Sequence, residues 1–407
     1  MTSKVEQPSR VQGRLRTRFD ALFTTISDTA VARERAHELP TRLVRDLADA
    51  GFTALRVPVE FGGSAVSLVE LSELLVDLAA ADSNIVQILR AHFLYTDMLR
   101  QAPKSPERDD WLRRIGNGDL IGGAYTERSA ENRSHFSTTV TRTDDGRRLV
   151  SGEKFYSTGS WYADWIVTTG EGTDGITQAV VARGAPGVEL LDDWNGFGQR
   201  LSVSGTTRFR AVDATATPPL PDSQGPGSYG TSLAQYWHIA TLAGVARAAH
   251  RDVVEYVRRR RRYFAQGSGS VPAHDPVVQS VVGEISAAAF TAASLTRQLA
   301  YRLDELDHAI SVDDANDQFL DEVEVEVYRA QVVAVNLVLT ATTRLFDVGG
   351  ASALDAEISL DRHWRNARTL ASHNPVPHRL VSIGDHDLNG TSPFRAWLSG
   401  TDLRDRA

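Results

Sequence analysis

The chain has 407 residues, of which 42% are hydrophobic, and a formal net charge of −8 at pH 7. This length exceeds the ~250–300 residues at which a single core stops growing, so two or three packed domains are expected. The chain has no cysteine, which excludes disulfide frameworks, thiolate nucleophiles and cysteine-bound zinc or iron–sulfur centres. The acidic balance argues against a nucleic-acid partner, because neutralising phosphates needs a basic face.

We find no run of the ~18 apolar residues that a membrane span needs. The opening stretch, MTSKVEQPSR, lacks the apolar centre of a signal peptide. The expectation is a soluble cytoplasmic protein without a membrane partner.

The first ~118 residues have helical periodicity. Ser67 and Glu70 form a capping-box pattern, after which leucines recur at helical spacing from Leu68 to Leu78. Residues 50–64, AGFTALRVPVEFGGS, interrupt this pattern with Gly and Pro and are expected to form a loop. This part is predicted to be a helical domain, residues 1–118.

Short β-rich runs follow, including HFSTTVTRT, DWIVTTG, TQAVVAR and TTRFRAV, with Asp145-Gly146 as a hairpin signal. They predict a small β domain over residues 119–220. Residues 215–230 are rich in Pro, Gly and Ser and mark a linker. Helical patterns over roughly 231–265, 275–308 and 317–347 then predict a helical bundle over residues 225–407.

This order, together with four motifs, resembles the acyl-CoA dehydrogenase family over nearly the whole chain. The resemblance implies an α+β fold with an N-terminal α-helical domain, a middle β domain and a C-terminal four-helix bundle. The motifs are PVEFGG (58–63), AYTERSA (124–130), SGEKFYSTGSWYADW (151–165), and RRYFAQ (261–266) with a downstream Gln279.

In this family the flavin lies between the β domain and the bundle. The resemblance therefore implies that Tyr125, Thr126, Tyr156 and Thr158 contact it, with Thr158 near flavin N5. On residue type alone, these are ordinary Tyr and Thr residues of strands.

The five-arginine run Arg258–Arg262 is either a solvated basic face or a site for an anion. By resemblance, Arg261 is expected to bind the flavin phosphate of a neighbouring subunit, with Arg262 as the alternative and Gln279 as a further cofactor contact.

Acyl-CoA dehydrogenases remove a proton with a glutamate. One family position for this base falls on His373-Asn374-Pro375, and the other falls within residues 235–247, which contain no acid. An Asn amide has no useful basicity near neutral pH. Ordinary dehydrogenation is therefore not expected.

One branch of the family shows the same departures. The chain is similar to flavin-dependent monooxygenases of the dibenzothiophene monooxygenase type, and to related sulfur-acquisition oxidoreductases and amine N-hydroxylases. The resemblance rests on KFYSTGSWYADW (154–165), DDWNGFGQRLSVSGTTRF (192–209), RHWRNARTLASHNPV (362–376) and IGDHDLNG (383–390). It implies a two-component enzyme: a separate reductase supplies reduced FMN, a flavin C4a-hydroperoxide forms with O2, and oxygen passes to sulfur or nitrogen.

His373 stands beside the vacated base position and is the expected catalytic proton donor, because imidazole exchanges protons near neutral pH. Trp194 and Asn374 are expected to line the substrate pocket. A Trp in a β domain is nevertheless more often a core residue. His238 is a weaker pocket candidate, and we expect it on a helix surface.

His92 and Tyr95 share a helical face with Ile88 and Leu99. They are either core residues or, as the monooxygenase branch implies, catalytic residues facing the flavin. The sequence does not choose between these roles.

The FAD-binding members of the family use Gln-x-x-Gly-Gly near the adenine, whereas this chain has Phe346 in the Gln position of FDVGG. This difference favours FMN and leaves FAD possible. The family resemblance implies a homotetramer. Two alternatives stay open: a dehydrogenase-like oxidoreductase with a non-standard base, and a scaffold that has lost its flavin.

Overall fold

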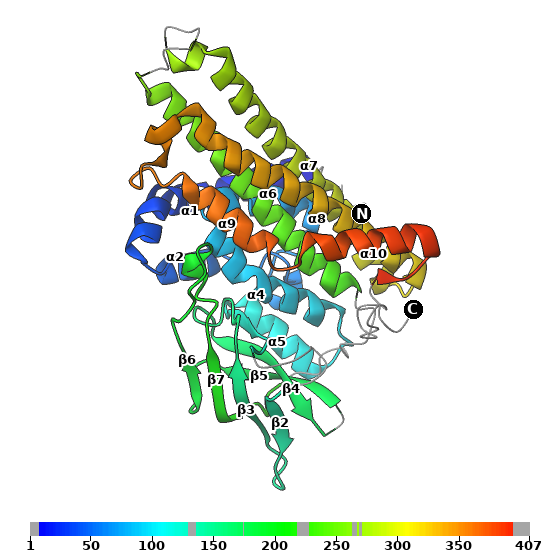
Figure 1. The fold of residues 1–407 in the computed structure, drawn as a ribbon. Helices are drawn as coiled ribbons and strands as arrows, with labels where there is room; N and C mark the ends of the chain where they lie inside the picture. The colour runs from blue at the N-terminus through cyan, green and yellow to red at the C-terminus, as the bar shows by residue number, and fades with distance from the viewer. Residues whose placement is uncertain are drawn as a thin grey trace, which may run out of the picture.

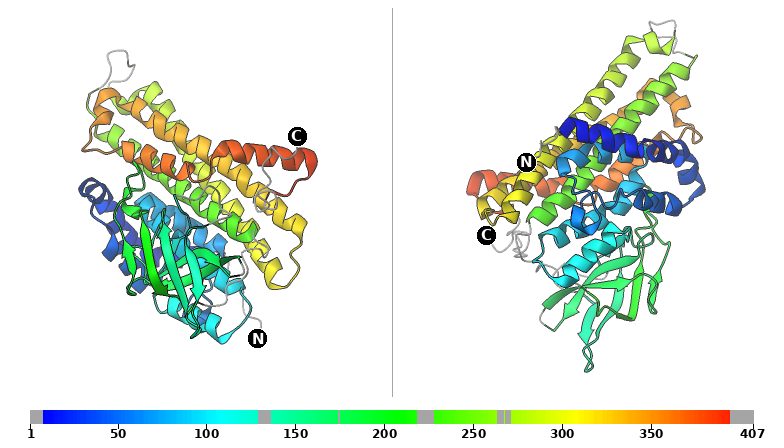
Figure 2. Two further views of the ribbon diagram at one scale, coloured as in Figure 1. Left: turned by 60° about the horizontal axis from the view of Figure 1, so that its bottom comes forward. Right: turned by 180° about the vertical axis from the view of Figure 1, so that it is seen from behind.

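The computed structural model describes residues 8–128, 136–173, 175–217, 228–262, 267 and 271–393. Helices form most of the molecule, and one β-sheet lies at its lower end (Figure 1). The long helices α6–α8 extend away from the sheet, and α1 lies on the face seen from behind (Figure 2).

The N-terminal region is helical, as predicted. Ser67 and Glu70 form the expected capping box at the start of α3. In the PVEFGG motif, Gly62 has φ +90°, a left-handed conformation that favours glycine, and a Cβ on Gly63 would clash with the carbonyl oxygen of Val57. The helices are α1 (Pro8–Ala36), α2 (Thr41–Asp49), α3 (Leu68–Ala81), α4 (Ser83–Gln101) and α5 (Pro106–Gly116).

The middle region is a seven-stranded mixed sheet with the order β1-β4-β2-β3-β7-β6, in which β5 also pairs with β4. Asp145-Gly146 lies in the turn of the antiparallel β2–β3 hairpin, as predicted. The strands are β1 (Ile121–Ala124), β2 (Thr139–Arg142), β3 (Arg148–Lys154), β4 (Trp165–Gly172), β5 (Gly175–Ala182), β6 (Val188–Leu190) and β7 (Thr207–Asp213).

The C-terminal region contains three long helices and two shorter ones. The prediction that the first helix continues to residue 265 was wrong, because α6 ends at Arg259. Most of the expected linker and Phe264 of RRYFAQ lie outside the described residues. The helices are α6 (Ser228–Arg259), α7 (Pro276–Ser311), α8 (Asp317–Arg344), α9 (Asp361–Ala371) and α10 (Val376–Asn389).

The two helical regions share a core. A single cluster of buried side chains runs from Phe19 through Leu75 of α3 to Trp237 of α6 and Val323 of α8. The α9 helix adds Ala367, Leu370 and other residues to a second cluster with α6 and α8. The bundle is therefore held against the N-terminal helices by extensive apolar burial, the dominant favourable term in folding.

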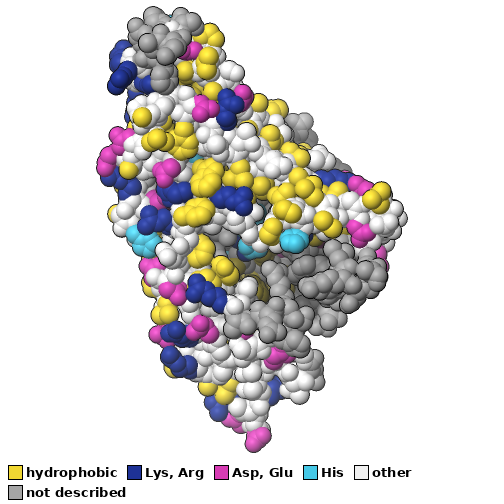
Figure 3. Space-filling model, viewed as in Figure 1, with side chains coloured by type: hydrophobic (Ala, Val, Ile, Leu, Met, Phe, Trp, Pro, Cys, Tyr) yellow, Lys and Arg dark blue, Asp and Glu magenta, His cyan; other side chains and the backbone are white. Residues whose placement is uncertain are grey.

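Two helices, α7 and α8, are long and apolar enough to cross a membrane by length and composition alone. Only 28% of the apolar window in α7 is buried within the chain. Hydrophobic side chains also gather over α9 and α10 on the face shown in Figure 3, where Leu380, Val381 and Leu388 are exposed.

Candidate functional site

The β-domain side of the site is built around the end of β1. Tyr125 and Thr126 follow this strand, and the backbone N–H of Phe155 donates to the Thr126 carbonyl at 2.7 Å. The backbone N–H of Gly123 donates to the carbonyl of Thr158 at 3.3 Å. A Cβ on Gly123 would lie 2.9 Å from the Tyr125 ring and 3.0 Å from Ala91 Cβ. The predicted residues Tyr125, Thr126 and Thr158 are thus brought together.

In the turn after β3, the Tyr156 side chain is exposed and the Thr158 side chain is buried. Tyr156 has φ +61°, an uncommon conformation for a residue other than glycine, and its side chain is 53% exposed. Its ring lies 6.0 Å from that of Trp194 between centroids. The buried Thr158 hydroxyl lies 2.7 Å from Ser204 Oγ, which lies 2.8 Å from Ser202 Oγ.

Two further hydroxyls flank Thr158. Those of Ser157 and Ser160 are buried and have no hydrogen-bond partner among the residues that the structure describes. Buried polar atoms in proteins normally have partners. This turn therefore offers unused hydrogen-bonding groups for a polar ligand such as the edge of a flavin ring.

The bundle side of the site is formed by the connection between α9 and α10. Here Asn374 Nδ2 lies 3.1 Å from His373 Nδ1, and Arg90 Nη2 of α4 lies 3.5 Å from His373 Nε2. The ring of His238, from α6, lies 4.4 Å from that of His373 between centroids. The predicted pair His373 and Asn374 therefore lies beside His238, the weaker pocket candidate, and beside Arg90, to which the sequence assigned no role.

The prediction of a surface position for His238 was wrong. Its side chain is buried, and neither ring nitrogen has a hydrogen-bond partner among the described residues. Burial lowers the pKa of His238 well below its usual value, and the neighbouring His373 and Arg90 lower it further. His238 is therefore neutral at physiological pH.

His92 is held by the backbone on both sides of its ring. Nε2 donates to the Thr53 carbonyl at 2.9 Å, and Nδ1 accepts from the Ile121 backbone N–H at 3.2 Å. Burial lowers its pKa to about 4. In this arrangement His92 fixes the start of β1 and has no ring nitrogen left for a reacting group, which supports the core role over the catalytic one.

Tyr95 lies in the core beneath the site. Its side chain is fully buried and packs edge-on against Trp111, and its hydroxyl has no hydrogen-bond partner within the described ranges. Burial raises the pKa of Tyr95, and the nearby Tyr125 hydroxyl raises it further. Tyr95 thus borders the site through Tyr125.

Two predicted cofactor residues lie away from this cluster. Arg261 and Gln279 are exposed at the α6–α7 end of the bundle. The helical residues from His238 to Arg259 span about 30 Å at 1.5 Å each. Within one chain, a phosphate in contact with the cluster around His373 is therefore out of reach of Arg261 and Gln279.

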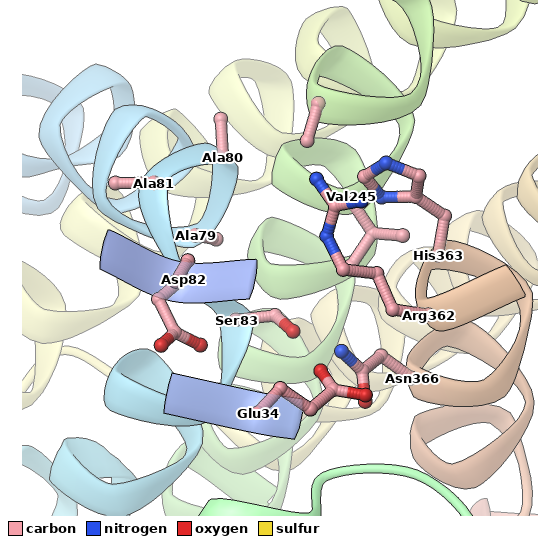
Figure 4. Close-up of a pocket in the computed structure, with 12 residues that line it drawn as sticks. Glu34, Ala79, Ala80, Ala81, Asp82, Ser83, Val245, Arg362, His363 and Asn366 are labelled. Carbon is pink, nitrogen blue, oxygen red and sulfur yellow. The ribbon is translucent and has the colours of Figure 1, made fainter. Parts of the chain in front are cut away.

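The α9 helix links the bundle to the loop that carries Trp194. Asn366 Oδ1 accepts from the backbone N–H of Gln199 at 2.7 Å, and Trp194 Nε1 donates to the Gln199 carbonyl at 3.1 Å. Asn366 lines a cavity of about 30 Å³ between α9 and the helices α1, α3, α4 and α6 (Figure 4). It has room for a water molecule or two, far below the ~300 Å³ of a ligand pocket.

Sequence reasoning missed Arg90 and Ser204 and gave His238 the wrong environment. The helical period places Arg90 off the buried face that Ile88, His92 and Tyr95 share. Its proximity to His373 depends on how α4 packs against the connection after α9. No local pattern in the sequence signals that contact.

Comparisons with known proteins agree with this arrangement. The family model for the acyl-CoA dehydrogenase N-terminal domain matches residues 13–119, and the model for the acyl-CoA dehydrogenase C-terminal domain matches residues 236–377. Dibenzothiophene monooxygenase of Rhodococcus qingshengii is 27% identical over 392 residues, covering 91% of this chain and 92% of the relative.

A probable FMNH2-dependent monooxygenase of Pseudomonas putida, SfnC, is 28% identical over 386 residues, covering 92% of this chain and 94% of the relative. Among solved structures, FMN-bound TdsC of Paenibacillus sp. A11-2 has a TM-score of 0.86 and 25% identity, covering 93% of this chain and 99% of the other.

Proposed function

Because the chain belongs to the acyl-CoA dehydrogenase superfamily, in its flavin-dependent monooxygenase branch, we propose that it is a two-component monooxygenase that uses reduced FMN. It transfers one oxygen atom from O2 to a sulfur or nitrogen atom of a small organic substrate. Its full-length relatives include enzymes of this activity.

One observation carries the proposal. Where the dehydrogenases hold a catalytic glutamate, this chain has Asn374 next to His373, and the described groups around His373 include Arg90, His238 and Asn374. A cationic guanidinium, an imidazole and an amide thus stand at the position of that glutamate. The arrangement offers proton donors and hydrogen-bond donors in place of a base that removes a proton from carbon.

The residues around Thr158 fit a flavin ring. The partly exposed Tyr125 and exposed Tyr156 would contact the ring, and the hydroxyls of Thr158 and its neighbours Ser157 and Ser160 would bond its polar edge. Bound reduced FMN supplies the electrons that activate O2. A separate reductase would supply the reduced cofactor.

His373 would act on the bundle side as a proton donor to the oxygen that leaves as water. His238 cannot compete for this role, because burial keeps it neutral. Its ring, together with Trp194 and Asn374, would line the substrate pocket and exclude water from the reacting atoms. His92 and Tyr95 would support this site from the core.

The assembly would be a cytoplasmic homotetramer. The outward surface of α7 supports self-association, because Phe290 is 73% exposed and lies on the same helical face as the exposed Tyr301. A neighbouring chain would bring Arg261 and Gln279 to the flavin phosphate, which neither residue can reach within its own chain. Arg261→Ala should therefore weaken FMN binding and leave riboflavin binding almost unchanged; an equal loss for both would contradict the phosphate role.

The activity can be tested with a flavin reductase, NADH, FMN, O2 and a panel of organosulfur compounds and amines. We expect products that gain 16 mass units, and 18 when 18O2 replaces O2. Flavin turnover that yields hydrogen peroxide alone with every compound would contradict the proposal.

A second candidate function has one observation in its favour. Glu324 on α8 is buried, and its carboxylate is bonded by the hydroxyls of Thr231, Ser232 and Tyr328. Burial raises the pKa of Glu324, as a general base requires. Acyl-CoA turnover with an artificial electron acceptor, lost in Glu324→Gln, would favour a dehydrogenase with this unusual base.

A further inference from the structure

Arg90 is an arginine at the site without a carboxylate partner in the part of the chain that the structure describes. Its Nε atom is buried and makes no hydrogen bond there. The fully buried arginines are different: Arg33 pairs with Asp82, Arg56 with Asp97 and Arg108 with Asp109. The three fully buried guanidinium groups are thus each paired with a carboxylate. The Arg90 guanidinium in the site has no such pair among the described residues.

Arg90 nevertheless remains a cation. Burial lowers its pKa to about 10, and the Tyr125 hydroxyl opposes this shift. Since this value is well above neutral pH, the guanidinium stays protonated at ~7. A charged group removed from water without a partner is unfavourable, and a bound anion would relieve that cost through charge-assisted hydrogen bonds.

The neighbouring groups are arranged to share such an anion. In the tautomer that accepts from Asn374 at Nδ1, His373 carries its proton on Nε2 and directs it toward Arg90. In this tautomer Arg90 Nη2 and His373 Nε2, 3.5 Å apart, are both donors, so an oxyanion beside the pair could accept from the two of them. His238 adds a ring N–H, because neither of its nitrogens has a partner within the described residues.

We propose that Arg90, with His373 and His238, binds an organic oxyanion, so that the substrate carries either a sulfinate, whose own sulfur is oxidised, or a carboxylate or similar group beside the atom that is oxidised. This inference rests on the proposed function and narrows its substrate class. A neutral aromatic sulfur compound would leave Arg90 without a counter-charge. The same chemistry could come from the anionic reduced flavin, and the test separates these two sources.

The test compares two small probes of similar shape, methanesulfinate and neutral dimethyl sulfoxide, by calorimetric titration of the protein–FMN complex. We expect methanesulfinate to bind about tenfold more tightly or better, in line with the strength of charge-assisted hydrogen bonds. Arg90→Gln should abolish this difference, and Arg90→Lys should keep part of it. Arg368→Gln, which changes an exposed arginine on α9, is the matched control and should match the wild type.

Affinity for FMN and reduced FMN is measured in the same variants. Equal affinity for the two probes, or no binding of methanesulfinate by the wild type, would overturn the inference. So would an Arg90→Gln variant whose affinity falls for reduced FMN and not for the sulfinate, because Arg90 would then serve the flavin. Failure of the proposed function looks different: the wild-type chain itself would not bind FMN.

Discussion

His373 and His238 lie side by side, but their surroundings give them different roles. His238 is enclosed and stays neutral, whereas His373 is exposed on the connection between α9 and α10. In the proposed function, only His373 would both receive protons from solvent and pass them to a group in the site. Its partner Asn374 orients the ring.

Replacing His373 tests this division of roles. We expect His373→Gln to bind FMN almost normally and to release most of the consumed oxygen as hydrogen peroxide, lowering the product yield per O2 about tenfold or more, within the usual range for general acid catalysis. Oxygen-electrode and peroxide assays measure this ratio. His378→Gln, at an exposed position on α10, is the control, and the same yield in both variants would remove His373 from the chemistry.

Buried neutral histidines make stability depend on pH. The pKa of His92 is about 4 and so is that of His363, both lowered chiefly by burial, against about 6.5 in an unfolded chain. Between about pH 4 and 6.5 the unfolded chain therefore binds more protons than the folded one, and stability falls as the pH falls. Each histidine contributes a slope of up to about 1.4 kcal/mol per pH unit.

Urea unfolding at pH 7.5, 6.5, 5.5 and 4.5 measures this slope. His92→Gln should make the curve shallower in that window, whereas His274→Gln, at an exposed position, should leave it unchanged. An unaltered slope in His92→Gln would show that this buried ring does not remain neutral in the folded protein.

At the scale of elements, α8 holds the connection that carries His373. Gln331 Nε2 donates to the Asn374 carbonyl at 2.9 Å, and Gln331 Oε1 accepts from Arg379 Nε at 3.2 Å. In the proposed function, Gln331 would therefore act as a positioning residue, because it holds the backbone next to His373. The Gln331 side chain is buried, so its hydrogen bonds are costly to leave unmade.

We expect Gln331→Ala to lower the product yield per O2 severalfold while FMN affinity changes by less than about twofold, because only the connection after α9 loosens. Gln318→Ala, an exposed position on the same helix, serves as control. A normal yield in Gln331→Ala would mean that the connection is held by other contacts.

Short sequence motifs correctly predicted the structural features that are determined by residues close together in the sequence. The Ser67 capping box and the Asp145-Gly146 hairpin were both confirmed, because each depends on residues within a few positions. The burial of His238 and the contact between Arg90 and His373 were not predictable in this way. They arise where α4, α6 and the connection after α9 meet.

At the scale of the whole molecule, the outer face of α7 leaves Phe290 and Tyr301 exposed in the single chain. A second copy would cover these rings and would bring Arg261 toward a flavin that its own chain does not offer it. Such a contact is what the prediction that Arg261 binds the flavin phosphate of a neighbouring subunit requires.

Changing Phe290 to Asp should split the proposed homotetramer, because a charge replaces an aromatic side chain at an apolar interface. Light scattering after size-exclusion chromatography should report a lower mass and a weaker affinity for FMN. Ser280→Asp, at an exposed position near the start of α7, is the control. A monomeric wild-type protein would contradict the account of this surface.

The most direct test of the central claim is a stopped-flow experiment. The protein with reduced FMN is mixed with O2 in the absence of substrate, and the release of hydrogen peroxide is followed in time. We predict that peroxide appears at least about tenfold more slowly than from free reduced FMN, because the proton and hydrogen-bond donors around His373 would retain the activated oxygen. Release as fast as from free flavin would contradict it.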